Sequence, residues 1–183
     1  GTPFEIQKAT AALLTTNKRA YVLNSFGTGK TKSALWAWHY LYSNGLCGKL
    51  LVIAPLSTLN FTWAAEVFRT LPGIKTAVLH GTKDKRLHLL ANSAADVFVV
   101  NHDGLAVIAS ALAARPDITV LCIDELAAYR NNSDRTKLVR KYAQSMAWVW
   151  GMTGSPTPNA PTDAWNEATI ITPHTVPKYF NRF

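Results

Sequence analysis

The stretch from residue 19 to residue 31 constrains the fold of this chain more than any other. A short apolar run, Tyr-Val-Leu at 21–23, leads into a turn that ends Gly-Thr-Gly-Lys-Thr at 27–31. Apolar residues then recur with helical spacing as far as Gly45, which is placed to end a helix. A strand, a glycine-rich turn and a helix in this order predict a phosphate-binding loop, because backbone N–H groups and the helix N-terminus then face a polyphosphate.

The positions of this loop have separate expected roles. Lys30 can reach the β- and γ-phosphates of a nucleotide, and the hydroxyl of Thr31 can ligate Mg²⁺. Asn24 stands where the usual pattern begins with glycine, and asparagine tolerates a left-handed backbone better than most residues. Backbone donors to the phosphates are expected from Gly27, Thr28 and Gly29. The alternative is a Gly-Lys-Thr sequence that occurs by chance in a solvated turn.

Strand-like and helix-like segments alternate along the whole chain. Apolar runs without alternation, clearest at 50–54, are typical of parallel strands buried on both faces. Strands are predicted at 21–23, 49–55, 75–80, 96–101, 118–124 and 146–153. Besides the helix after the loop, helices are predicted at 4–15, 57–70, 83–92, 103–114, 134–144 and 162–171. This alternation predicts an α/β fold, a sandwich with a mostly parallel central sheet, in a single domain spanning residues 1–183.

The composition favours a folded domain without a membrane segment. Of the 183 residues, 48% are hydrophobic and 16% are charged, which argues against disorder. No apolar run approaches the ~20 residues that span a bilayer, so no membrane partner is expected. Cys47 and Cys122 lack metal-ligand spacing and no histidines are paired, so we expect no zinc site and a reducing, cytoplasmic location.

The charge balance is basic, with a formal net charge of +8. The positive side chains gather in two groups: Lys83, Lys85 and Arg86, and then Arg130, Arg135, Lys137, Arg140 and Lys141. A polyanion such as a nucleic acid is the expected partner. The alternative is a basic surface that only keeps the protein in solution.

Two acidic residues follow the predicted strand at 118–124. Four apolar residues precede Asp124 and Glu125, which is the Walker B arrangement. In this arrangement Asp124 holds Mg²⁺, and Glu125 orients or deprotonates the attacking water. Acidic residues at such a position can also simply cap a helix, but the phosphate-binding loop upstream favours the catalytic interpretation.

Polar residues also follow two other predicted strands. Ser57 and Thr58 come after the second strand, and Asn101 and His102 end the fourth. Because the carboxyl ends of parallel strands share one edge of the sheet, these side chains should lie near the nucleotide loop. Their hydroxyl and polar groups suit contacts with nucleic-acid phosphates, although plain helix capping explains Ser57 and Thr58 equally well.

Taken together and in this order, these stretches resemble superfamily 2 helicases, and among them the Swi/Snf-type translocases of double-stranded DNA. Residues 24–31 are similar to motif I of that family, residues 54–59 with Trp63 to motif Ia, and Asp124 with Glu125 to motif II. A motif III is suggested by Thr153, Gly154, Ser155 and Pro156 with Asn159. Motif III distinguishes this family from other phosphate-loop ATPases.

The resemblance implies a RecA-like lobe that binds ATP and Mg²⁺ and works on duplex DNA. It implies catalysis by Lys30, Asp124 and Glu125, with Mg²⁺ held by Thr31 and Asp124, and adenine recognition by Gln7. It further implies DNA contacts from Ser57, Thr58, Asn101 and His102, and coupling of the two sites through Thr153, Gly154 and Ser155. The expected function is the N-terminal lobe of a DNA-dependent ATPase. The alternatives are a nucleic-acid-binding module without turnover and a helicase acting on single-stranded DNA or RNA.

Two departures from the family pattern qualify this expectation. Ala127 occupies the fourth place of motif II, where the family has histidine, which leaves open how nucleotide state is coupled to motif III but not metal binding or hydrolysis. The second RecA-like lobe, which carries the arginine fingers, is not in this chain and is expected downstream on the same parent polypeptide. The isolated lobe should therefore hydrolyse ATP barely or not at all. The compact chain, without long insertions, resembles bacterial or phage relatives.

Overall fold

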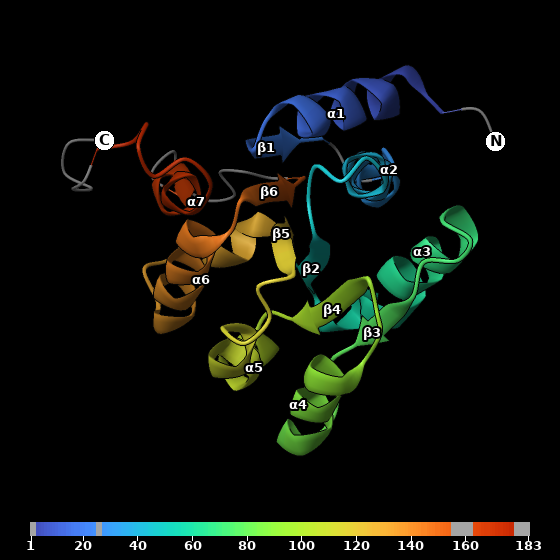
Figure 1. Ribbon diagram of the computed structural model, residues 1–183. Coiled ribbons are helices and arrows are strands. Elements are labelled where there is room, and N and C mark those ends of the chain that lie inside the picture. The colour runs from blue at the N-terminus through green and yellow to red at the C-terminus, as the bar shows by residue number, and fades with distance from the viewer. Residues whose placement is uncertain (1–2, 25–26, 155–162, 178–183) are drawn as a thin grey trace.

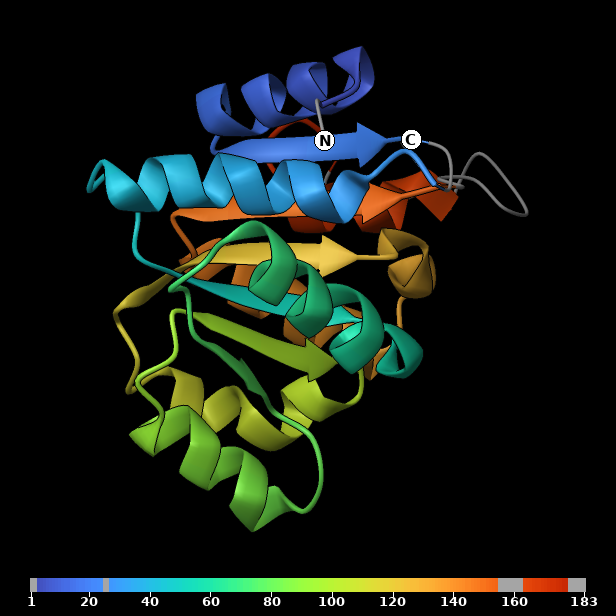
Figure 2. The same ribbon diagram turned by 90° about the vertical axis from the view of Figure 1, so that its right-hand side faces the viewer.

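A parallel sheet of six strands runs through the middle of the computed structural model, which describes residues 3–24, 27–154 and 163–177 (Figure 1). Across the sheet the order is β1 (Arg19–Leu23), β6 (Trp148–Thr153), β5 (Ile118–Asp124), β2 (Lys49–Ala54), β4 (Val97–Asn101) and β3 (Thr76–Val78). Each neighbouring pair is parallel, so the carboxyl ends of the strands share one edge (Figure 2).

Helices cover both faces of this sheet. One face carries α1 (Glu5–Thr16), α2 (Lys30–Ser43) and α3 (Ala65–Thr70), and the other carries α4 (Lys83–Asn92), α5 (Gly104–Leu112), α6 (Asp134–Ser145) and α7 (Asp163–Ile171). In β2, Leu50 and Val52 belong to the first core, Leu51 and Ile53 belong to the second, and all four are fully buried. The predicted α/β sandwich of three layers is confirmed. None of the helices in the described part of the chain is long and apolar enough to cross a membrane.

The segment after β2 departs from the continuous helix predicted at 57–70. Leu56–Thr58 form a 3₁₀ turn, Leu59–Ala64 are π-helical, and only Ala65–Thr70 form an α-helix. A π turn takes in an extra residue and is commonly found at functional sites. A second short 3₁₀ turn, Leu126–Tyr129, follows β5 and was not predicted.

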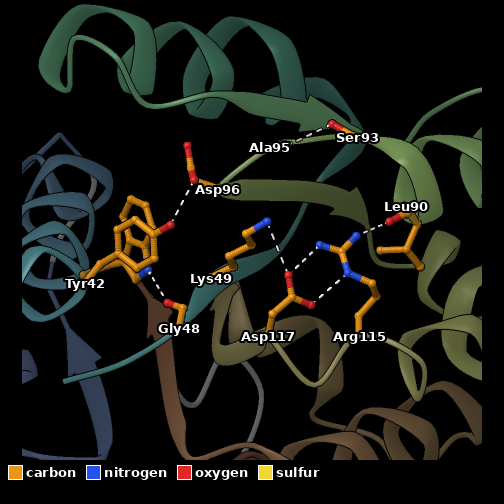
Figure 3. A network of polar contacts seen from close by, with 10 residues as sticks. Tyr42, Gly48, Lys49, Leu90, Ser93, Ala95, Asp96, Arg115 and Asp117 are labelled. Atoms are coloured by element: carbon orange, nitrogen blue, oxygen red, sulfur yellow. Dashed lines mark hydrogen bonds and ion pairs between the residues drawn. The ribbon is translucent and has the colours of Figure 1, made fainter. Parts of the chain in front are cut away.

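A polar network closes the amino edge of the sheet, opposite the glycine loop (Figure 3). The carboxylate of Asp117, just before β5, accepts two hydrogen bonds of 2.8 Å from Arg115 and lies 3.3 Å from the Nζ of Lys49. These contacts, with Arg115 first, lower the pKa of Asp117 to about 2. Asp96, just before β4, accepts a 3.0 Å hydrogen bond from the hydroxyl of Tyr42. The starts of β2, β4 and β5 are thus fixed by side chains.

A buried carboxyl group joins α7 to β1. Tyr21 donates its hydroxyl to Oε2 of Glu167, which is 0% exposed, while Oε1 of Glu167 has no hydrogen-bond partner among the described residues. Burial raises the pKa of Glu167 to about 8. At neutral pH this group therefore keeps a proton in the folded chain.

We predict that Glu167→Gln makes the stability of the chain less sensitive to pH. The folded chain holds the Glu167 proton up to about pH 8, whereas the unfolded chain releases it at about pH 4.3. Between these values the unfolded state binds fewer protons, so stability falls as the pH rises. The melting temperature should drop several degrees more in the native chain than in the variant between about pH 5 and about pH 8. Glu5→Gln, on the exposed side of α1, is the control, and an equal drop in native chain and Glu167→Gln would contradict the assignment.

Candidate nucleotide-binding site

The glycine loop lies at the carboxyl edge of the sheet, between β1 and α2 (Figure 2). A cleft of about 480 Å³ opens there, with walls from the loop, from the segment after β2 and from the end of β5. Its lining includes Lys30, Thr31, Asp124 and Glu125, the four residues predicted to carry the chemistry. A larger hollow of about 680 Å³ lies between α5 and α6, near the start of β5, and contains none of the predicted site residues.

Two glycines give the loop its shape. Gly27 and Gly29 both have a φ of +76°, a left-handed conformation that glycine adopts without steric cost. Lys30 follows as the first residue of α2, and its Nζ donates to the carbonyl oxygen of Asn24 at 2.7 Å. The ammonium group therefore lies over the start of the loop, where phosphate oxygens are expected.

Helix α1 is attached to this loop by two side chains. Gln7 is 7% exposed, and its Oε1 accepts a 3.1 Å hydrogen bond from the backbone amide of Phe4. Its side-chain amide lies so close to Gly29 that a Cβ atom at position 29 would overlap the Gln7 side chain. Asn24 donates from Nδ2 to the hydroxyl of Thr10 at 2.8 Å. The substitution of asparagine for the first glycine of the pattern thus ties the loop to α1.

Asp124 ends β5 and lies in the lining of the cleft. Burial raises the pKa of its carboxyl group, and a hydrogen bond from Trp63 and the charge of Lys30 oppose that rise. The Nε1 of Trp63 donates to Oδ2 of Asp124 at 2.8 Å. The carboxylate is therefore oriented by a neutral donor and lies within the field of the loop lysine.

Glu125 has the strained backbone of the site. Its φ of 59° and ψ of 62° are left-handed, and no other non-glycine residue in the described part of the chain has a positive φ. That conformation costs roughly 1–2 kcal/mol for a residue with a Cβ. The side-chain Oε1 of Glu125 accepts a 2.8 Å hydrogen bond from the hydroxyl of Thr153, the last residue of β6. The predicted catalytic and coupling residues are thus in direct contact.

The oxygen donors in the cleft suit a magnesium ion. Thr31 and Asp124 offer a hydroxyl and a carboxylate, the hard oxygen ligands that Mg²⁺ prefers. Among the residues described, no group of three His, Cys, Asp or Glu side chains could hold a metal ion. The residues present therefore fit an ion that takes most of its ligands from phosphate oxygens and water, as Mg²⁺ does in nucleotide sites.

The residues predicted to contact nucleic acid differ in their surroundings. Ser57 is exposed on the 3₁₀ turn after β2. Thr58 lines the nucleotide cleft, and its hydroxyl donates to the carbonyl of Pro55 at 2.9 Å. Oδ1 of Asn101 accepts a 2.8 Å hydrogen bond from Nη1 of Arg86. Asn101 therefore helps to hold α4 against β4, whatever its side chain does toward a ligand.

His102 lies inside the protein. It is 9% exposed, and its Nδ1 lies 2.7 Å from the hydroxyl of Tyr129. Burial, and then the charge of Arg135, lower the pKa of His102 to about 4. The imidazole is therefore neutral at neutral pH, and its predicted contact with DNA stays a prediction. Of the motif III residues, Thr153 and Gly154 are described, while Ser155, Pro156 and Asn159 lie outside the described residues.

Sequence reasoning did not predict the places of Glu66 and Trp63 at this site. Glu66, from α3, is part of the lining and lies 3.9 Å from the Nζ of Lys32. Trp63 was noted only as part of motif Ia, and its contact with Asp124 was not predicted. One signal was available, because a buried indole N–H requires an acceptor and the end of a neighbouring strand offers a carboxylate.

The fold and the cleft together define a RecA-like phosphate-loop lobe. The computed structure superposes on the Sulfolobus solfataricus SWI2/SNF2 ATPase core in complex with dsDNA with a TM-score of 0.78, at 20% identity over 95% of this chain and 36% of that chain. A family model for the SNF2-related domain matches residues 13–179. The chain belongs to the SNF2-related domain family, the ATPase domain of Swi2/Snf2-type helicases.

Sequence relatives agree with this assignment. The chain is similar to protein p41 of Acyrthosiphon pisum secondary endosymbiont phage 1, with 32% identity over 163 residues, which are 84% of this chain and 35% of that protein. It is also similar to the ATP-dependent DNA helicase DDM1 of Arabidopsis thaliana, with 43% identity over 63 residues, or 34% of this chain and 8% of that protein. The chain thus spans about a third of p41 and a small part of DDM1.

We predict that Gly29→Ala disturbs the loop more than Gly27→Ala. Both glycines have the same φ, so the left-handed backbone costs each alanine roughly 1–2 kcal/mol. Only the Cβ at position 29 also meets the side chain of Gln7, whereas no atom of the described residues lies within 4 Å of a Cβ at position 27. Thermal denaturation should therefore show a lower melting temperature for Gly29→Ala, and adding Gln7→Ala should recover part of the loss. Equal melting temperatures for the two single variants would contradict the contact.

Proposed function

We propose that this chain is the ATP- and Mg²⁺-binding lobe of a DNA-dependent ATPase that moves along duplex DNA. The observation that carries the proposal is that Lys30, Thr31, Asp124 and Glu125 line one cleft beside a glycine loop. These residues come from the start of α2 and from the end of β5, and the parallel sheet puts both at one edge.

The proposed roles follow from the position of each group. The backbone N–H groups of residues 27–29 and the ammonium of Lys30 would bind the phosphates. Glu125 would orient or deprotonate the attacking water from its place beside Thr153. Thr31 and Asp124 would hold Mg²⁺, which when bound would offset the negative charge of the phosphates. Gln7, packed against the loop, would read the adenine.

Duplex DNA is the proposed partner. The net charge of +8 favours a polyanion, and the structural neighbour from Sulfolobus solfataricus is described as a complex with dsDNA. Not every basic residue is equally available, because Arg86 donates to the carbonyls of Leu79 and Gly81 and Arg135 pairs with Asp103. We therefore propose that Lys83 and Lys85 carry more of the phosphate contact than Arg86.

A second RecA-like lobe is proposed as the other partner. The chain spans 35% of p41 and 36% of the SWI2/SNF2 core chain, which leaves room for one in a longer parent protein. Arginine fingers from such a lobe contribute roughly 10³–10⁵ to the rate of related phosphoryl transfers. We infer that the single lobe turns ATP over barely or not at all.

One observation favours a second candidate, a nucleic-acid-binding module without turnover. Ala127 replaces the motif II histidine, and it is buried and apolar, so it cannot form a polar link to motif III. The contact between Glu125 and Thr153 favours a site that hydrolyses ATP.

Steady-state ATP hydrolysis tests the proposal. We expect this chain alone to show no activity above Lys30→Ala, with or without duplex DNA. With the downstream sequence of the parent restored, duplex DNA should stimulate hydrolysis, Lys30→Ala should lower it by at least about 100-fold, and Lys8→Ala on the exposed side of α1 should leave it unchanged.

Other outcomes separate the alternatives. Strong DNA-stimulated hydrolysis by the lobe alone, lost in Lys30→Ala, would refute the two-lobe account. Nucleotide binding without DNA-stimulated hydrolysis in the restored protein would favour the module without turnover. Stimulation by RNA or single-stranded DNA, but not by duplex DNA, would make the duplex assignment wrong.

A further inference from the structure

A buried tryptophan joins the segment after β2 to the end of β5. Trp63 is 0% exposed and lies in the π-helical stretch Leu59–Ala64. Its Nε1 donates to Oδ2 of Asp124 at 2.8 Å. The contact links a residue of the helical segment directly to the carboxylate that is proposed to bind magnesium.

The donor and the acceptor of this hydrogen bond are fixed by the chemistry of the two groups. An indole N–H can only donate, so it holds a carboxylate oxygen as an acceptor and leaves no ambiguity about the partner. The ring is enclosed in the core of the first sheet face with Leu59 and Val67, and so has no freedom to turn away. The orientation of Asp124 is therefore fixed before any ligand arrives.

The same segment also forms a wall of the nucleotide cleft. Thr58, Thr62 and Glu66, which precede and follow Trp63 by a few residues, all belong to the lining. Phe61, in contrast, is 86% exposed, so the π-helical stretch turns one aromatic ring inward and another outward. The segment thus contributes to the cleft through its surface and through one buried hydrogen bond.

We propose that Trp63 is a positioning residue for the magnesium carboxylate, holding Asp124 in the orientation that receives the ion. This inference rests on the proposed function, because it requires a magnesium–nucleotide site in this cleft. The hydrogen-bonding neighbours of metal-binding groups commonly matter in this way, and their loss lowers metal affinity by roughly 10–100-fold. If Trp63 served packing alone, its indole N–H would be irrelevant to magnesium.

The chain offers a matched control for the test. Trp38 is also 0% exposed, and its Nε1 donates to the carbonyl of Gly48 at 3.1 Å, at the amino edge of the sheet. Trp63→Phe and Trp38→Phe therefore each remove one buried indole donor from the same core. Only the first faces a carboxylate in the cleft.

The experiment measures the affinity of the chain for a non-hydrolysable ATP analogue by calorimetry, once with EDTA and once with Mg²⁺. Mg²⁺ raises the affinity of the native chain for the analogue, and we expect this rise to be about tenfold smaller in Trp63→Phe. Trp38→Phe should retain that gain in full. The affinity measured in EDTA should be equal in all three proteins, because the loop itself is unchanged.

A second measurement needs no variant. In the ¹⁵N-labelled native chain saturated with the analogue, the indole N–H resonance of Trp63 should shift when Mg²⁺ is added, and that of Trp38 should not. This readout stands even if Trp63→Phe fails to fold.

The outcomes separate the inference from the function beneath it. A native chain that binds the analogue equally with and without Mg²⁺, or not at all, would overturn the proposed site and this inference together. Three other outcomes would overturn the inference alone. Mg²⁺ could raise the affinity of Trp63→Phe as much as that of the native chain, or Trp63→Phe could lose the same affinity in EDTA as in Mg²⁺. The Trp63 resonance could also stay unshifted when Mg²⁺ is added.

Discussion

The burial of the central sheet on both faces is the constraint on which the rest of this structure depends. In β2, Leu50, Leu51, Val52 and Ile53 are all fully buried, half of them against each helical layer. Because its side chains are buried in the two cores, a strand of this kind has none that can contact a ligand. Polar function is therefore confined to the points where the strands end, and parallel pairing brings those points to one edge. Asp124 and Thr153 are both the last residues of neighbouring strands.

The two edges of the sheet differ in how completely their charges are matched. At the amino edge, Asp117 is surrounded by Arg115 and Lys49, which hold its pKa near 2 (Figure 3). At the carboxyl edge, burial raises the pKa of Asp124, and a neutral indole donor rather than a close ion pair orients it. The first edge is a closed network that holds the strands together. At the second edge the carboxyl group of Asp124 has no close cationic partner among the described residues, so a bound cation would stabilise its charge.

The parts of the molecule that depend on local pattern were predictable from the sequence. The strands, the glycine loop and the acidic pair at 124–125 follow from apolar runs and from residues adjacent in the chain. Features set by contacts between distant segments were not predictable. The helix expected at 57–70 gives way to a π-helical stretch, and Trp63 meets Asp124 from a segment far away in the chain, so the only signal was that a buried indole N–H requires an acceptor. His102 was placed correctly after β4, but its partner Tyr129 comes from a turn that the pattern did not reveal.

Ala127 stands where the family has the motif II histidine, and Glu125 supplies a different link from the end of β5 to β6. The backbone of Glu125 is left-handed, and Oε1 of its carboxylate accepts a hydrogen bond from Thr153 at the end of β6. The ends of β5 and β6 are thereby connected without a side chain from Ala127. In the proposed mechanism the group that acts on water is then also the group that touches motif III. In that mechanism a change in the phosphate at the cleft would reach β6 through this hydrogen bond, and hydrolysis and coupling would share one contact.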